Sequence, residues 1–437
     1  MLHKASRFLL VCALFAVSAA PAMAAEASIP AGTVITQSNW QQYKQFMSVT
    51  LQNMFMSTSP TTNVPPGAKI VVGPTQHYAI GNAFWNATEK YAKQVKLVRA
   101  STGSYGLSGY VAGEPFPDVN PSDPLAGYKV MYNLYYYYNP AIIVYDRSQV
   151  MDIDRYGNES KLHALLVDYL LMHITDPGYP MQVAGFQGIY QTRVAEQTDP
   201  EQIKYVTALN ITFDDPNHFP ESYVFLPSLR RAIRLSSAAR CAPFQGQDFN
   251  NDDETNVPLP PVWFQAKLVG LKPMLMFIYR PDHKTLAASA QRSSYYPGGA
   301  NLFPKPEVLG PWQMRDLYVV QIQRLPQFQS GYCYAKRLNY LDKEAVTSVG
   351  YDTWDQNGKV WRGMVPLEAP LQKPDGSYYL TASSWAHDNP DFQNSHQSLL
   401  MPPVAGPDAV YLDQKVPSAY VNYQRYATPA GLQEIMQ

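Results

Sequence analysis

The residue types that usually perform catalysis are not grouped by spacing in this sequence. It contains none of the patterns G-x-S-x-G, G-x-x-x-x-G-K-[ST], H-E-x-x-H and C-x-x-C, which supply a nucleophile, a phosphate cradle, a zinc site and a redox pair. Beyond the first residues the histidines stand singly, at His77, His163, His173, His218, His283, His387 and His396. We therefore expect no enzyme, no cofactor and no metal. A hydrolase assembled from residues distant in sequence is the remaining enzymatic alternative.

An acidic stretch runs from Asp248 to Glu254. Carboxylate and amide oxygens are ligands that calcium prefers, but the stretch lacks the glycine and the terminal glutamate spacing of an EF-hand loop. We expect a solvated loop whose side chains cap turns, and calcium binding is the alternative.

Three arginines offer a different chemistry, the binding of an anion. Arg230, Arg231 and Arg234 follow the predicted strand Ser222 to Leu226. A guanidinium binds carboxylate or phosphate through two parallel hydrogen bonds, so these residues could hold an anionic head group beside an apolar groove. Because successive strand residues face opposite sides, Arg231 and Arg234 do not share a face. The alternative is that they decorate an exposed surface or pair with the acidic stretch.

Three large aromatic residues are our candidates for the wall of that groove: Trp312, Tyr340 and Trp361. Each is at least as compatible with ordinary core packing, because aromatic side chains contribute much of the buried area of a core. With the three arginines they form the predicted ligand-binding set.

The N-terminus has the layout of a cleavable secretory signal. Two basic residues precede an apolar run, Phe8 to Ala20, and Ala22-Met23-Ala24 has the small-x-small pattern of a signal peptidase site. The run is shorter than the ~20 residues of a membrane helix. We predict a signal peptide over residues 1–24 and a periplasmic protein with a single domain over residues 25–437.

Two cysteines, Cys241 and Cys333, remain after this cleavage, because Cys12 lies inside the apolar run. An even number in an oxidising compartment indicates one disulfide, and two separate buried thiols are the alternative.

Composition points to a β-rich protein and away from nucleic acid. Cleavage removes Lys4 and Arg7, so 34 basic and 35 acidic residues become 32 and 35, a net charge of −3. A near-neutral chain lacks the basic face that nucleic acid normally requires. Charged residues make up 16% of the chain against a typical ~25%, whereas there are 32 tyrosines and 37 prolines. Tyrosine favours strands, and proline favours turns and sheet edges.

Two helices are predicted near the N-terminus. From Asn39 to Phe55 apolar residues recur on one face, with Ser38 as the N-cap and Gln41 completing a capping box. The second helix is predicted near Ile80 to Val95.

Most of the remaining chain favours strands. The predicted strands are Tyr128 to Tyr138, Ala141 to Tyr145, Leu162 to Ile174 (with a helix as the alternative), Val206 to Phe213, Ser222 to Leu226, Arg231 to Ser236, Phe264 to Val269, Pro273 to Tyr279, Leu317 to Arg324, Cys333 to Tyr340, Ala345 to Trp354 and Lys359 to Met364. Gly103 to Pro124 favours an ordered loop, and the proline-rich tail from Pro366 favours irregular structure that wraps the sheet. Many successive strands with few helices indicate a mainly β fold on one large, curved antiparallel sheet.

Several segments resemble known families. Outer-membrane lipoprotein-sorting proteins related to LolA and LolB are similar at Tyr223 to Arg231, Phe244 to Phe249 and Lys267 to Gly270. The DUF1329 family of Gram-negative periplasmic proteins is a closer match, at Gly113 to Pro117, Asp123 to Gly127, Trp312 to Val320, and Tyr351-Asp352 through Gly358 to Trp361-Arg362. The chain departs from that family at Ala232 and Ile233, where the family is more basic.

The resemblance implies an α+β fold, an unclosed LolA/LolB-like half-barrel with helices on its concave side. LolA-like proteins use this cavity for lipid acyl chains. The resemblance also implies association with a transporter of the resistance-nodulation-division (RND) type and an outer-membrane protein. We therefore predict a periplasmic carrier or chaperone for a lipid or other hydrophobic small molecule. The alternative is a subunit that docks on an envelope transporter through a sheet edge and the tail, without a ligand.

Overall fold

The computed structural model describes residues 28–78, 80–236, 241–243, 246–254, 259–278, 311–366, 370–372, 378–380, 387–401 and 410–435. The predicted signal peptide lies outside these residues, as do Phe244, Tyr279 and His283.

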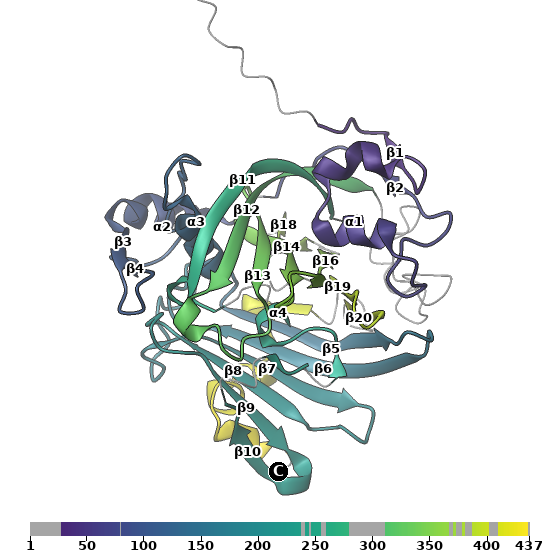
Figure 1. Ribbon diagram of the computed structural model, residues 1–437. Coiled ribbons are helices and arrows are strands. Elements are labelled where there is room, and N and C mark those ends of the chain that lie inside the picture. The colour runs from purple at the N-terminus through teal and green to yellow at the C-terminus, as the bar shows by residue number, and fades with distance from the viewer. Residues whose placement is uncertain are drawn as a thin grey trace, which may run out of the picture.

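One antiparallel sheet of 15 strands dominates the described part of the chain (Figure 1). Its order is β10-β9-β8-β7-β6-β5-β20-β19-β15-β14-β13-β12-β11, and β16 pairs with β19 and β21 with β5. The strands are β5 (Ile142–Ile153), β6 (Glu159–Leu170), β7 (Ile189–Asp199), β8 (Thr207–Phe213), β9 (Glu221–Leu226), β10 (Arg231–Arg234), β11 (Phe264–Phe277), β12 (Trp312–Arg324), β13 (Lys336–Asp342), β14 (Thr347–Trp354), β15 (Val360–Gly363), β16 (Val365–Pro366), β19 (His387–Asp391), β20 (His396–Met401) and β21 (Val410–Leu412).

The sheet bends round and stays open, as predicted. In Figure 1 strands β11–β13 arch over the top while β5–β10 form the floor. The end strands β10 and β11 do not pair with each other, so the sheet is an unclosed half-barrel.

Alternation of residue type along the strands gives the sheet two different faces. Val144, Val167, Val194 and Leu209 are in register across β5–β8, and each is at most 1% exposed. The C-terminal segment packs in the same apolar cluster, through α7 (Tyr423–Tyr426) and η11 (Gly431–Glu434). Because successive strand residues face opposite sides, the next row faces the other way. That row is polar: Asp168, Arg193, Asn210 and Ser222.

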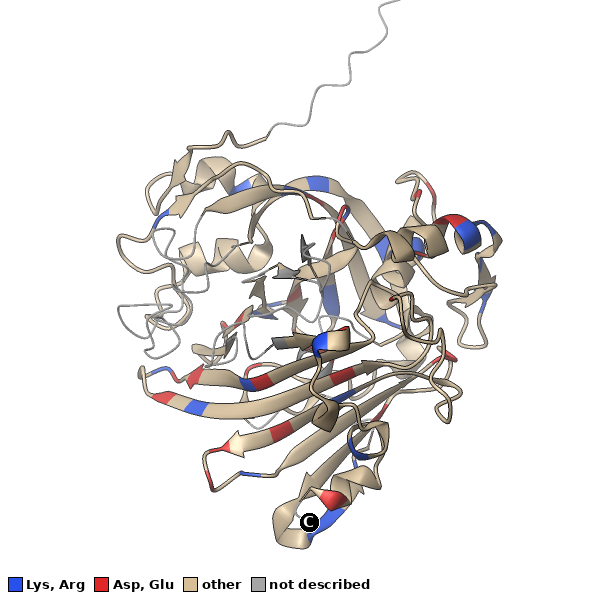
Figure 2. Cartoon of the chain, turned by 180° about the vertical axis from the view of Figure 1, so that it is seen from behind, with Lys and Arg blue, Asp and Glu red and all other residues tan. Residues whose placement is uncertain are grey.

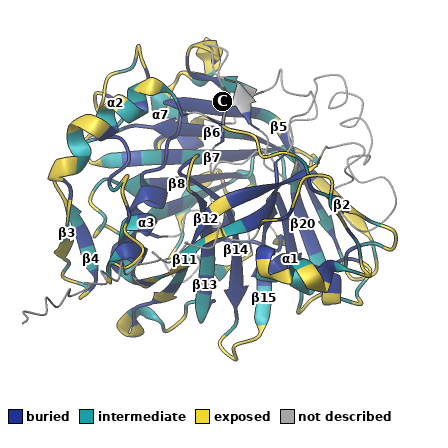
Figure 3. Cartoon of the chain, turned by 90° about the horizontal axis from the view of Figure 1, so that it is seen from above, coloured by how far each residue is buried: buried dark blue, intermediate teal, exposed yellow. Residues whose placement is uncertain are grey.

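Three two-stranded sheets lie outside the main one: β1 (Val34–Ile35) with β2 (Ile70–Val71), β3 (Lys96–Arg99) with β4 (Tyr105–Ser108), and β17 (Leu371–Gln372) with β18 (Tyr378–Tyr379). Figure 3 shows that buried residues follow the main sheet and that exposed residues gather on α2 (Asn82–Tyr91) and in the loops. The prediction of a helix near Ile80 to Val95 is confirmed by α2 and the adjoining η2 (Ala92–Gln94).

The predicted strand from Tyr128 to Tyr138 is wrong, because this tyrosine-rich segment forms the helix α3 (Ala126–Tyr135). All its residues except Lys129 are buried. Gly127 lies directly on the backbone of β11 at Ala266, so the helix packs against the sheet at close range. A helix that is apolar on every side is stable only when it is enclosed, and burial here outweighs the strand preference of tyrosine.

The first predicted helix is divided, and its predicted cap is wrong. A 3-10 helix, η1 (Trp40–Phe46), precedes α1 (Val49–Met56), and the N-cap of α1 is Ser48, whose hydroxyl accepts from the Leu51 N–H. Asp352 on β14 accepts from the N–H groups of Val49 and Thr50, which fixes the start of α1 on the sheet.

The expectation of an irregular tail is also wrong. Residues beyond Pro366 supply β19 and β20, which lie in the middle of the main sheet between β15 and β5. Residues Gln397–Met401 of β20 pair with β5, and this pairing outweighs the local proline content.

Candidate ligand-binding site

Buried ion pairs line the polar face of the sheet. Arg337 contacts Asp253 at 2.7 Å, Arg362 contacts Asp391 at 3.0 Å, and Arg193 donates to Asp168 at 2.7 Å. Charges removed from water are tolerated only when they are paired and hydrogen-bonded, so these contacts fix the strands against one another. This interior differs from the apolar cavity that the resemblance implies.

The acidic stretch follows β10 and precedes β11 in the chain, and it crosses this polar face. Phe249, Asn250 and Asp253 are at most 2% exposed. The Asn250 amide donates to the Tyr334 hydroxyl at 3.2 Å, and Tyr334 donates to Asp253. Tyr334 lies just before β13, 84 residues from Asn250 in sequence. The expectation of a solvated loop is therefore wrong, and the stretch with its helical turn α4 (Asn251–Glu254) is a buried plug.

Asp248 is the most unusual acid of this plug. Its N–H donates to the Ser398 hydroxyl at 2.8 Å, and that hydroxyl also contacts Asp152 at 2.6 Å. Burial raises the pKa of Asp248 to about 8, and the negative charges of Asp391 and Asp152 add to the effect. Asp248 therefore carries a proton at neutral pH for much of the time.

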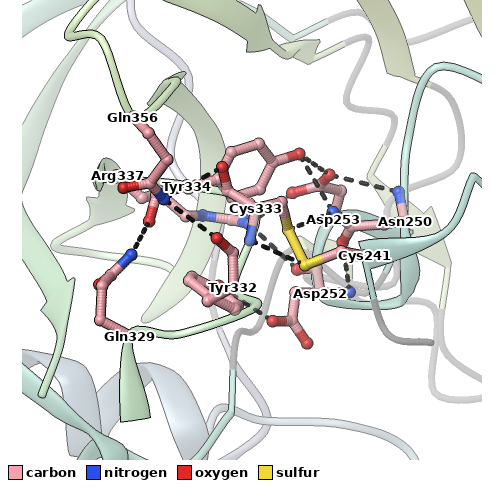
Figure 4. Close-up of a disulfide and its surroundings, with 10 residues drawn as sticks. All are labelled: Cys241, Asn250, Asp252, Asp253, Gln329, Tyr332, Cys333, Tyr334, Arg337 and Gln356. Carbon is pink, nitrogen blue, oxygen red and sulfur yellow. Dashed lines mark hydrogen bonds and ion pairs between the residues drawn. A yellow bond between two sulfur atoms is a disulfide. The ribbon is translucent and has the colours of Figure 1, made fainter. Parts of the chain in front are cut away.

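A disulfide between Cys241 and Cys333 ties the segment before the plug to the loop before β13 (Figure 4). The Asn250 amide also reaches Cys333 Sγ at 3.4 Å, and Tyr332 donates to Asp252 at 3.0 Å. The cysteine pairing predicted from the even count is thus present in the structure.

A pocket of about 810 Å³ lies beside this disulfide, where the two end strands of the sheet approach. Its wall comes from the segments around β9 and β10, from η6 (Pro261–Trp263) before β11 and from η7 (Pro326–Phe328) after β12. The larger apolar side chains of the wall are Phe219, Leu235, Leu259, Trp263, Phe328 and Tyr332. The polar ones are Glu221, Ser222, Arg234, Ser236, Arg324, Gln327 and Ser330.

Arg324 places a cation inside the apolar part of the wall. Its side chain is largely buried, and its guanidinium carbon lies 5.3 Å from the ring centres of Phe264 and Tyr332, 5.5 Å from Phe219 and 5.6 Å from Trp263. Aromatic faces attract a guanidinium through their negative electrostatic potential, so the rings hold the arginine in a fixed position.

Arg234 supplies a second cation at the rim. Its guanidinium donates to Glu221 at 2.7 Å, and its side chain is 61% exposed. Glu221 in turn accepts from the Tyr223 hydroxyl at 2.7 Å. The rim is therefore polar and adjustable, whereas the cation farther inside is enclosed by rings.

The structure does not bring the six predicted ligand-binding residues together. Arg234 lines the pocket, while Arg230 and Arg231 are exposed at the turn between β9 and β10. Trp312 packs against Phe277 in another core cluster. Tyr340 donates to Asp352, and Trp361 donates to Asp391 at 3.0 Å, so both belong to the framework of the sheet.

Sequence reasoning missed Arg324 and the rings around it. Arg324 ends a predicted strand, but Phe219, Trp263 and Phe328 come from three loops that are distant in sequence. No local spacing joins them, and only the turn signals next to each ring could have marked them as residues at strand ends. Among the described residues, no three His, Cys, Asp or Glu side chains are grouped closely enough to hold a metal ion.

Three solved structures are similar: a putative outer membrane lipoprotein-sorting protein domain from Vibrio parahaemolyticus (11% identity, TM-score 0.45, covering 70% of this chain and 100% of that one), a DUF1329 family protein from Desulfovibrio piger (13%, 0.45, 70% and 100%), and a LolA superfamily protein from Nitrosomonas europaea (10%, 0.36, 68% and 97%). A search of curated proteins finds no match. No helix in the described ranges has the length and apolar character to cross a bilayer. The model of the family called protein of unknown function (DUF1329) matches residues 34–425, so the chain belongs to the DUF1329 family.

Proposed function

We propose that this protein is a periplasmic carrier that holds an amphiphilic, lipid-like molecule in the pocket between β10 and β11. The observation that carries the proposal is the pocket itself, about 810 Å³ in volume and lined by aromatic rings and two arginines. Clefts of ~300–1,000 Å³ with mostly apolar walls and few polar groups are the usual form of a small-molecule site.

The wall chemistry favours a molecule with an apolar body and an anionic group. Phe219, Trp263 and Phe328 offer apolar surface, whose burial contributes roughly 25 cal/mol per Å². Arg234 is exposed and can turn from Glu221 to a carboxylate or phosphate, because a guanidinium binds both through paired hydrogen bonds. Arg324 favours a negative group nearby through its charge.

The position of the pocket refines the carrier hypothesis. The polar face under the middle of the sheet is occupied by the plug, so the ligand is expected at the open edge of the half-barrel. There the sheet ends and hydrogen bonds between strands need not break for a ligand to enter. Delivery to an RND-type transporter and an outer-membrane protein is the corresponding proposal for partners, and cross-linking in cells tests it.

Native mass spectrometry of the protein isolated from the periplasm tests the proposal. We expect a copurified mass, or an added mass after incubation with palmitate or phosphatidylglycerol. Ser330→Trp places a large ring at the exposed rim of the pocket, and Ser38→Trp adds the same ring at an exposed site near the N-terminus. The first variant should bind about tenfold more weakly or worse, since 1.4 kcal/mol of lost contact corresponds to tenfold in Kd.

Ser38→Trp should bind like the wild type. A clean apo mass in every preparation, with no added mass from either lipid, would contradict the carrier function. Equal binding by both tryptophan variants would move the site away from this pocket.

A further inference from the structure

The lobe formed by α2, η2 and β3 carries a concentrated positive charge. Lys90, Lys93, Lys96 and Arg99 are exposed, and Glu89 is the only acidic residue from position 89 to position 99. Four positive charges and one negative charge give this segment a net charge of +3. Because the whole chain has a net charge of −1, the rest of it sums to −4.

These cations are not neutralised by neighbouring carboxylates. Within the described residues, none of the four makes an ion pair. Lys90 lies over the ring of Tyr91 at 4.8 Å, and Arg99 lies over the ring of Tyr105 at 4.3 Å. Both contacts leave the positive charge uncompensated, so the surface keeps its full potential for attracting an anionic partner.

The lobe also projects from the body of the molecule. Figure 2 shows α2 and β3 at the periphery, away from the main sheet, with basic residues on both. Val98 is 40% exposed on the same face of β3 as Lys96, whereas Leu97 packs inward against the core. Lysines close to an anionic membrane surface are attracted to it electrostatically.

We propose that this surface, made of Lys90, Lys93, Lys96 and Val98, docks on anionic phospholipid head groups of a bilayer. Its three cations are all lysines, whose compact and strongly hydrated charge suits non-directional attraction to many phosphates. A protein partner that offers paired carboxylates would favour the planar fork of arginine instead. The docking surface is separate from the pocket and does not depend on the proposed carrier function.

Vesicle flotation with the full-length mature protein tests the docking. We expect binding to vesicles of phosphatidylethanolamine and phosphatidylglycerol, little binding to phosphatidylcholine alone, and loss of binding at high salt because the attraction is screened. The triple variant Lys90→Glu, Lys93→Glu, Lys96→Glu should bind about 100-fold more weakly or worse, since each lysine near an anionic surface contributes roughly a factor of five.

A second triple variant makes the same change in net charge elsewhere. Lys267→Glu, Lys272→Glu, Lys343→Glu alters three exposed lysines on and beside β11 and β13, and it should bind like the wild type. Matching thermal melting curves establish that both variants fold. Failure of the wild type to float with the anionic vesicles, or equal binding by the two triple variants, overturns the proposal. Neither result bears on ligand binding in the pocket.

Discussion

Glu114 illustrates how single buried groups set the properties of this protein. It lies in the loop before α3, is 7% exposed and accepts a hydrogen bond from the Asn133 amide at 2.6 Å. Burial raises the pKa of Glu114 from its ordinary value of 4.5 to about 8, and the charge of Asp118 adds to the effect. The protonated form is therefore favoured in the fold.

This pKa makes stability depend on pH. The folded-state pKa of Glu114 is above the unfolded value. Its contribution to the free energy of unfolding is therefore complete below about pH 4.5 and is lost as the pH rises to about 8. Glu114→Gln keeps the shape without the charge, so at pH 9 its free energy of unfolding should exceed that of the wild type by a few kcal/mol, with little difference at pH 5. Urea denaturation at both pH values measures this, with the exposed Glu434→Gln as control. Parallel pH profiles for Glu114→Gln and the wild type would exclude the effect.

For single residues, the sequence predicts the kind of interaction better than it predicts where the residue lies in the fold. The even number of cysteines predicted a disulfide, with two separate thiols as the alternative, and the structure pairs Cys241 with Cys333. Asp248 and Asp253 were predicted to be solvated, since their buried partners lie on strands whose place in the sheet cannot be derived from local spacing. For the same reason, the sequence did not indicate that Arg324 lines the pocket.

Among the elements, α3 depends most on its surroundings. Its segment is rich in residues that favour strands, yet it is helical because the concave side of the half-barrel encloses it. The strands β6, β8, β9 and β12 were predictable, because their residues follow turn signals and carry the expected apolar content. Local sequence failed for α3, which is buried on all sides, and it also failed for β7, β19 and β20, which pair along the sheet.

Close contact between α3 and β11 gives a test at this scale. A Cβ atom at Gly127 would lie 2.7 Å from the backbone of Ala266 and 2.7 Å from the Leu268 nitrogen. Gly127→Ala should therefore destabilise the fold by about 1–3 kcal/mol through overpacking, although alanine favours a helix. Gly270→Ala on β11 is the control, because the nearest contact of a Cβ atom added there is the Lys272 side chain at 3.5 Å. Equal urea midpoints for the two variants would show that α3 can shift without cost.

For the molecule as a whole, the disulfide links two segments that lie far apart in the sequence. It closes a loop across a sequence separation of 92 residues, between the segment before the plug and the loop before β13. Cys241→Ser with Cys333→Ser should lower the free energy of unfolding by about 2–4 kcal/mol, because the unfolded chain gains freedom. Guanidinium unfolding with and without a thiol reductant measures this. The reductant should shift only the wild type, and an unshifted wild-type midpoint would contradict the prediction.

The overall shape was predictable from the family resemblance, while the strand order was not. The open, curved sheet was expected, but nothing in residues 387–401 indicates that β19 and β20 lie between β15 and β5. Short connections make neighbours in sequence the usual neighbours in a sheet, and these two strands depart from that rule.

This strand order has a consequence for biogenesis. Among the described strands, the earlier strands β5–β10 and the later strands β11–β15 are joined in the main sheet only through β19 and β20. A chain synthesised from its N-terminus leaves β5 and β15 as open edges until β19 and β20 follow. Such edges invite pairing with other chains. A premature stop codon shortly after Pro366 should therefore yield a chain whose two groups of strands lack the strands that connect them and which associates with other chains.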